Sequence, residues 1–193
     1  MVRSRRRPEW HVIVPQIFSQ CINEATCSSK TRAEYTDLIL NSYIQAHPEE
    51  NKQRAKWSHL QMNVGKVWQR LMGQCYDVFD LRSNDPSGLD LLSYKRKFVV
   101  ELKNRYNTDN ASARRANLTK LVDFKLANPD YEVIYAYVNE STTMRTLEGT
   151  DTYLNVEDVQ IRHLTGGKLL AYIFGEDWKL IVSLLENEAI NCL

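Results

Sequence analysis

The sequence predicts a mixed α/β fold in which helices pack on a central sheet. Two segments, 57–72 and 111–127, carry apolar residues at helical spacing. Three short apolar segments lie between them, and the β-prone segment 131–138 follows the second. The predicted order of elements from about residue 57 to residue 138 is therefore helix, strand, strand, strand, helix, strand.

The helix at 57–72 is predicted from a single apolar face. Six residues follow the i, i+3, i+4, i+7 pattern, namely Trp57, Leu60, Val64, Val67, Trp68 and Leu71. Gly73 is placed to cap the C-terminal end of this helix. An earlier helix is expected at 31–46, because Thr31 and Glu34 have the spacing of a capping box and Pro48 stops a helix.

Strands and turns alternate after the helix at 57–72. The three strands are predicted at 76–81, 89–94 and 97–103. The segment 84–88 has the composition of a turn. The tight polar turn Lys95-Arg96 joins the second strand to the third, so these two strands are expected to be antiparallel. Asn128-Pro129-Asp130 ends the helix at 111–127.

The outer parts of the chain carry weaker signals. Residues 1–10 read as a basic arm with four arginines, and the whole chain, 1–193, reads as one domain around the core at 57–138. After this core the predicted elements are short strands at 152–154 and 161–163, a hairpin turn at Gly166-Gly167 leading into 168–174, and an amphipathic helix at 176–187.

The composition fits one globular domain. Hydrophobic residues make up 43% and charged residues 25% of the 193 residues, and no apolar run approaches the roughly 18 residues of a membrane helix. The apolar stretch at 12–14 is too short for a signal peptide. The four cysteines form no CxxC pair and no zinc spacing. Reduced thiols and a cytoplasmic location are expected.

Charge is unevenly distributed along the chain, although the net charge is only +1. Residues 52–70 carry five basic residues and no acid, and residues 90–125 carry nine basic residues against four acids. Residues 126–161 carry one arginine against seven acids. A basic face for a polyanion such as nucleic acid would produce this pattern, and so would patchiness that averages out in space.

A candidate catalytic group lies on the second and third strands. Glu101 and Lys103 share one face of the third strand, because side chains alternate. A hairpin centred on Lys95-Arg96 pairs position 90 with position 101, so the Cβ atoms of Asp90 and Glu101 are expected about 5 Å apart. Two carboxylates this close repel each other and need a cation between them, and oxygen ligands suit Mg²⁺. A bound Mg²⁺ would polarise a phosphate oxygen, with Lys103 stabilising charge or orienting the attacking water. The alternative is a set of plain surface charges.

Asp90 together with Glu101-Leu102-Lys103 resembles the PD-(D/E)XK nuclease superfamily, with Pro86 displaced to four residues before Asp90. The resemblance implies an αβββαβ restriction-endonuclease-like core with a mixed central sheet flanked by helices. It also implies that Asp90, Glu101 and Lys103 are catalytic and that Asp90 and Glu101 hold the metal. The run from Glu101 to Thr108 is similar to that of type II restriction endonucleases that cut interrupted GGNCC palindromes.

One feature of the superfamily is absent. Many members carry a glutamate on the first core helix, but no acid lies between Trp57 and Met72, so no third carboxylate is assigned. Gln69 is a polar residue on this helix that could approach the site, although we expect its amide to be solvated at the surface.

Short polar and basic residues follow the third strand and suit contacts to DNA phosphates. The predicted DNA-binding residues are Asn104, Arg105, Asn107, Thr108, Ser112, Arg114 and Arg115. Equally, the segment from Asn107 to Ser112 fits a loop and a helix N-cap, and Tyr106 would either stack on a base or pack.

The leading interpretation is a Mg²⁺-dependent type II deoxyribonuclease that cuts double-stranded DNA at a short palindromic site. A palindrome implies a homodimer with two-fold symmetry. The alternatives are a repair or recombination nuclease of the junction-resolvase type, a DNA-binding protein with an inactive nuclease core, and a module that binds an acidic partner. The intact set of Asp90, Glu101 and Lys103 argues against an inactive core.

Overall fold

The structure is a computed structural model that describes residues 8–27, 63–81, 85–105, 110–139 and 149–191. The strands are β1 (Phe79–Asp80), β2 (Leu91–Ser93), β3 (Phe98–Arg105), β4 (Glu132–Asn139), β5 (Asp151–Val156) and β6 (Val159–Thr165). The helices are α1 (Trp10–Cys27), a helix at residues 63–72, α4 (Ala111–Ala127), α5 (Gly166–Phe174), the short 3-10 helix η3 (Gly175–Asp177) and α6 (Trp178–Asn191).

The strands form a six-stranded mixed sheet of order β1-β2-β3-β4-β6-β5. β1, β2 and β3 are antiparallel neighbours, whereas β3, β4 and β6 run parallel and β5 is antiparallel to β6. α4 makes the crossover from β3 to β4, as a parallel pair requires. The predicted order of helix, three strands, helix and strand is confirmed in the described part of the chain, and so is the mixed α/β class.

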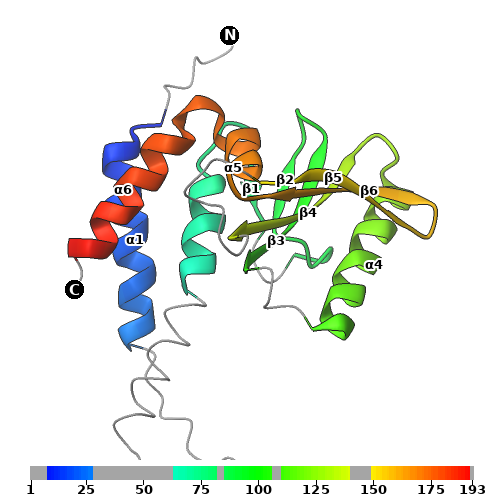
Figure 1. Cartoon of the computed structure of the whole chain (residues 1–193), viewed down its shortest axis with the longest axis horizontal. Coiled ribbons are helices and arrows are strands. Elements are labelled where there is room, and N and C mark those ends of the chain that lie inside the picture. Colours follow the sequence, from blue (N-terminus) through cyan, green and yellow to red (C-terminus); the bar gives the residue numbers. More distant parts are fainter. Residues whose placement is uncertain (1–7, 28–62, 82–84, 106–109, 140–148, 192–193) are drawn as a thin grey trace, which may run out of the picture.

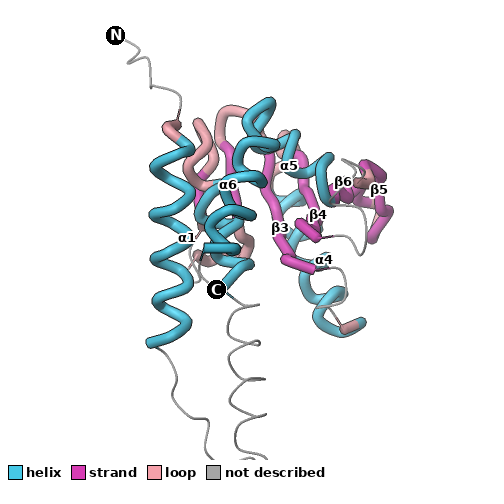
Figure 2. The backbone as a smooth tube through the Cα atoms, turned by 60° about the vertical axis from the view of Figure 1, so that its left-hand side comes forward, coloured by secondary structure: helices cyan, strands magenta, loops and turns pink. Residues whose placement is uncertain are grey.

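Helices cover both faces of the sheet (Figures 1 and 2). One face packs against α1, the helix at 63–72, α5 and α6 in a single hydrophobic cluster. The other face packs against α4 through Leu121 and Val122. β3 contributes to both clusters, with Val100 on the first face and Val99 on the second, so the alternation puts Glu101 on the face covered by α4.

α1 has no counterpart among the predicted elements. It begins at Trp10, the last residue of the predicted basic arm, and Trp10 and Phe18 are buried. The indole N–H of Trp10 donates to Oδ2 of Asp177 at 3.0 Å, and α1 lies beside α6 (Figure 1). This burial offsets the presence of Pro15 inside the helix, which costs about 3 kcal/mol or more in a helix interior. Residues 1–7 and the predicted helix at 31–46 lie outside the described residues.

The prediction of a hairpin turn at Gly166-Gly167 is wrong. These glycines begin α5, and Gly166 has a φ of 50°, which turns the chain from β6 into the helix. The segment 168–174 is helical because its apolar residues fall on one face. The buried side chains of this face are Leu169, Leu170, Ile173 and Phe174.

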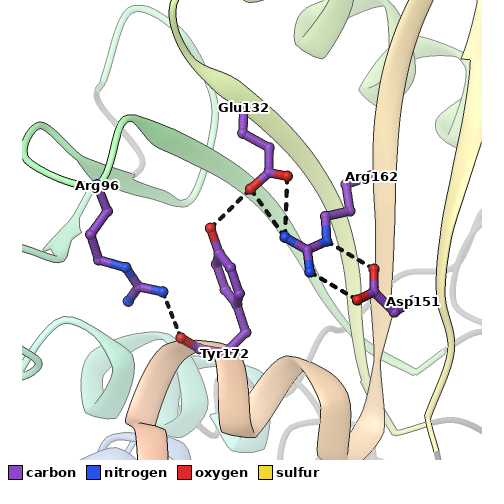
Figure 3. Close-up of polar contacts among 5 residues, drawn as sticks. All are labelled: Arg96, Glu132, Asp151, Arg162 and Tyr172. Carbon is purple, nitrogen blue, oxygen red and sulfur yellow. Dashed lines mark hydrogen bonds and ion pairs between the residues drawn. The ribbon is translucent and has the colours of Figure 1, made fainter.

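An ion-pair network connects β4, β6, β5 and α5 at the end of the sheet where β4 begins (Figure 3). Arg162 lies between Glu132 and Asp151, with N–O distances of 3.1 Å to Glu132 and 2.8 Å to Asp151. The hydroxyl of Tyr172 donates to Glu132 at 2.9 Å, and Arg96 donates to the backbone carbonyl of Tyr172 at 2.6 Å. These contacts fix the β5–β6 hairpin against the rest of the sheet.

Two cysteines can be described. Cys21 is buried and its Sγ accepts from Nη1 of Arg70 at 3.4 Å, whereas Cys75 is a half-buried thiol. Among the residues that the structure describes, no helix combines the length and the apolar character needed to span a membrane.

Candidate active site

The predicted register of the hairpin between β2 and β3 is confirmed. Leu91 pairs with Val100 and Ser93 with Phe98. Asp90 lies one residue before β2, where its backbone N–H donates to the carbonyl of Val100 at 3.0 Å. The register therefore brings Asp90 beside Glu101, the next residue of β3.

The carboxylate of Asp90 is fixed against β3. Its Oδ2 accepts the backbone N–H of Leu102 at 2.7 Å. Burial and then the negative charge of Glu101 raise the pKa of Asp90 to about 6. The Leu102 N–H and the charges of Lys103 and Lys120 act in the opposite direction and offset only part of this rise. Asp90 thus lies close to a second carboxylate in a partly dehydrated place.

Glu101 is almost completely buried, with 3% of its surface exposed. Its Oε1 accepts from Nζ of Lys103 at 2.5 Å, and the Lys103 side chain is 23% exposed. Its Oε2 is buried and has no hydrogen-bond partner. A buried carboxylate oxygen without a donor is costly, unless a ligand supplies the missing positive charge.

This arrangement fits a divalent cation held by oxygen atoms. In the described part of the chain, no group of three or more His, Cys, Asp and Glu side chains is suited to hold a metal ion. The protein's own ligands at this site would be the two carboxylates of Asp90 and Glu101. Mg²⁺ is commonly held by one or two carboxylates, with waters and substrate phosphates completing its shell. The unpartnered Oε2 of Glu101 is the atom of this site that most needs a cation.

Residues 32–179 match the family model described as Eco47II restriction endonuclease. The match covers more than half of the chain, and it includes the whole sheet together with α4 and α5. The chain belongs to the Eco47II restriction endonuclease family. A search of curated proteins finds no match. Family membership makes the protein a DNA-cleaving hydrolase with DNA as its substrate.

Gln69 of this restriction endonuclease is not solvated as predicted. Its Nε2 donates to Oδ1 of Asp80 at 2.9 Å and lies 3.3 Å from the carbonyl of Asp90 and 3.4 Å from that of Leu81. The sequence showed only a polar residue on a helix. The contact depends on how the helix at 63–72 packs against β1 and β2, which no local pattern gives.

Aromatic side chains on β4 and β6 lie beside Glu101 and Lys103, two of the three predicted catalytic residues of the endonuclease. Tyr135 is opposite Glu101, Tyr137 is opposite Lys103, and His163 is opposite Tyr135. The Tyr137 hydroxyl donates to that of Tyr135 at 3.3 Å. Sequence reasoning missed these residues, although the period-two spacing of Tyr135 and Tyr137 within a predicted strand puts both on one face.

The predicted DNA-binding residues fall in three places. Asn104, on β3, accepts from Nδ2 of Asn139 at 2.8 Å. Ser112, Arg114 and Arg115 are exposed on α4. Tyr106, Asn107 and Thr108 lie outside the described residues, as does the side chain of Arg105.

The start of α4 shows which residue is its N-cap. The side chain of Asn110 accepts from the N–H of Ala113 at 2.8 Å. Ser112 is therefore inside the helix, and its exposed hydroxyl does not cap it.

Lys120 connects α4 to the turn before Asp90. Its Nζ donates to the carbonyl of Gly88 at 3.1 Å. Gly88 has a φ of +62°, a conformation that suits glycine, and the Lys120 side chain lies 3.5 Å from where a Cβ would stand. The turn before Asp90 is thus held against α4 by Lys120.

Proposed function

We propose that the protein is a type II restriction endonuclease that hydrolyses phosphodiester bonds of double-stranded DNA at a short palindromic site, with Mg²⁺ as cofactor. Asp90, Glu101 and Lys103 are the proposed catalytic residues, and Asp90 and Glu101 the proposed metal ligands. The observation that carries the proposal is the buried, unpartnered Oε2 of Glu101 beside Asp90, in a chain of a restriction endonuclease family.

The chemistry follows from charge. When bound, Mg²⁺ supplies a Lewis acid that polarises a phosphate oxygen and lowers the pKa of a water. Hydrolysis forms a P–O bond from water and breaks the P–O bond to a sugar oxygen. The ammonium of Lys103, now paired with Glu101, stabilises the negative charge that develops on the phosphoryl oxygens. Burial of Glu101 lowers the local dielectric constant and so strengthens its ion pair with Lys103.

The proposal extends to the target and the assembly. The similarity of the run from Glu101 to Thr108 supports an interrupted GGNCC palindrome as the target. A palindrome places two equivalent scissile bonds about a two-fold axis, so we infer a homodimer in which each protomer cuts one strand. The substrate class also favours action in the cytoplasm.

Digestion of an unmethylated plasmid tests the function. We expect discrete fragments with Mg²⁺, none with EDTA, and none from the Glu101→Gln variant with Mg²⁺. Sequencing of the fragment ends then gives the site and the stagger. Cleavage of branched DNA only would support a junction-resolvase activity, and full cleavage by a folded Glu101→Gln variant would refute the assigned site.

A further inference from the structure

The amide of Gln69 contacts the backbone that carries Asp90. It donates to the carboxylate of Asp80 at 2.9 Å and lies 3.3 Å from the carbonyl oxygen of Asp90. The same carbonyl accepts the backbone N–H of Leu81 at 2.8 Å. The Asp90 carbonyl therefore meets two donors, one from the helix at 63–72 and one from the end of β1.

Gln69 and the carboxylate of Asp90 lie on opposite faces of the sheet. Asp80 pairs with Leu91, which belongs to the cluster under the helix at 63–72. The Asp90 carboxylate instead meets Leu102 N–H and faces Glu101, on the side covered by α4. Gln69 therefore cannot act on a phosphate there, and its influence is confined to the position of the Asp90 backbone.

The helix that carries Gln69 packs closely against β1. At the end of the helix at 63–72, a Cβ added to Gly73 would lie only 2.8 Å from Cβ of Asp80. The helix end is thus pressed against β1, and the Gln69 side chain bridges a short, fixed gap.

We propose that Gln69 is a positioning residue for Asp90, and that it holds the Asp90 backbone from behind while Asp80 orients its amide. The inference rests on the proposed function, because Asp90 is taken as a metal ligand. It adds a role for Gln69 and Asp80 in the reaction. Partners of metal-ligating groups commonly change metal affinity or activity 10- to 100-fold when removed.

The test compares three variants. Gln69→Ala removes the donor, and Gln69→Glu keeps the shape without the N–H groups. The double variant Gln69→Glu/Asp80→Asn exchanges donor and acceptor, so it restores the bond between positions 69 and 80 but not the donation to the Asp90 carbonyl. Gln74→Ala is the matched control, because Gln74 is exposed and its side-chain amide donates to the carbonyl of Arg70 in its own segment, at 3.4 Å.

Cleavage is measured against Mg²⁺ concentration, with thermal melting as the check on folding. All three position-69 variants are expected to cut about 10- to 100-fold more slowly than wild type and to need more Mg²⁺. The double variant is expected to melt like wild type and still cut slowly. Wild-type cutting by Gln69→Ala, or recovery of cutting in the double variant, would overturn the role.

Hydrogen exchange at the Leu102 amide gives a readout that does not need activity. This N–H donates to Asp90, so looser positioning of Asp90 is expected to speed its exchange about tenfold in Gln69→Ala, while β4 amides are unchanged. An unchanged Leu102 rate would refute the positioning role, even if no variant cuts DNA. A wild-type protein that cuts no DNA would refute the proposed function alone.

Discussion

Ionisation of Asp90 lowers the stability of the folded protein, because its carboxyl is buried and faces Glu101. Its pKa is about 6 in the folded protein, above its ordinary value of 3.8. A group with a raised pKa contributes its full stability below the unfolded pKa and loses it as the pH rises through the folded pKa. The loss from Asp90 therefore falls between about pH 4 and pH 6.

Asp90→Asn should accordingly stabilise the metal-free protein at high pH. An asparagine retains an oxygen that accepts the Leu102 N–H and never ionises. The expected gain in the free energy of unfolding is about 2–3 kcal/mol at pH 8 and close to zero near pH 4. Urea denaturation in EDTA at both pH values measures it. Asp123→Asn, at an exposed position of α4, is the control, and an equal gain at both pH values would contradict the assignment.

The ion pair of Glu101 with Lys103 predicts opposite effects on metal-free DNA binding. Glu101→Gln removes a charge that repels phosphates and releases the Lys103 ammonium, so DNA should bind about fivefold more tightly. Lys103→Ala leaves two carboxylates without their cation, so binding should weaken by a similar factor. Gel-shift titrations in EDTA measure both. Equal affinities for the two variants would show that neither side chain faces DNA.

For single residues, the sequence predicts which side chains come together when they belong to the same hairpin. The turn at Lys95-Arg96 and strand alternation suffice to bring Asp90, Glu101 and Lys103 together. Hairpin geometry cannot predict the contacts of Gln69, because they join a helix to two strands. Whether a polar side chain is solvated or bonded depends on tertiary packing, which periodicity does not contain.

α4 is the element that carries exposed basic residues next to the site. Arg114 and Arg115 are exposed near its start, and Lys120 in its middle contacts the turn before Asp90. The sequence predicts this helix at 111–127 and it is found at Ala111–Ala127, where Asn110 caps its start and Asn128-Pro129 follows its end.

Arg114→Gln and Arg115→Gln are expected to weaken DNA binding for all sequences alike. Each lost phosphate contact should reduce the slope of log K against log salt by about one unit. Titrations at several salt concentrations measure the slope. Lys179→Gln, an exposed position on α6 in the opposite helix layer, should leave it unchanged. Unchanged slopes for both arginine variants would remove these residues from the interface.

The prediction of element boundaries from the sequence fails where one local signal is compatible with two structures. A glycine pair after a strand is typical of a turn, but Gly166 uses its positive φ to enter α5. α1 has no predicted counterpart, and it is stabilised by tertiary packing, because Trp10 and Phe18 are buried in the cluster that α1 shares with α5 and α6. In both cases the tertiary partner decides, and it lies far away in sequence.

Across the whole molecule, charge in space differs from charge along the chain. Three acids of the segment 126–161 form ion pairs within the fold. Asp130 pairs with Lys97 at 3.1 Å, and Glu132 and Asp151 pair with Arg162. The acidic segment is therefore partly neutralised, and the exposed arginines of α4 carry the argument for a DNA-binding face.

Mixed dimers would report on the proposed assembly. If each protomer cuts one strand, wild-type protein mixed with an excess of the Glu101→Gln variant and refolded together should form dimers with one active site. We expect such mixtures to convert supercoiled plasmid to nicked circles, which agarose gels resolve from linear DNA. Linear product without a nicked intermediate at any mixing ratio would contradict one strand per protomer.

The pairing of α1 with α6 has a consequence for how the protein is made. Trp10 reaches Asp177, the residue before α6, across 167 positions of the chain, and α1 also packs on α6, so the first described helix completes its packing only with the last one. Contacts of such sequence separation form late, because the loop between them must close first. On the ribosome, the part of α1 that packs against α6 therefore stays uncovered until α6 has emerged. Synthesis in the cell thus passes through a stage in which the sheet can form while its outer helix layer is still open to chaperones and proteases.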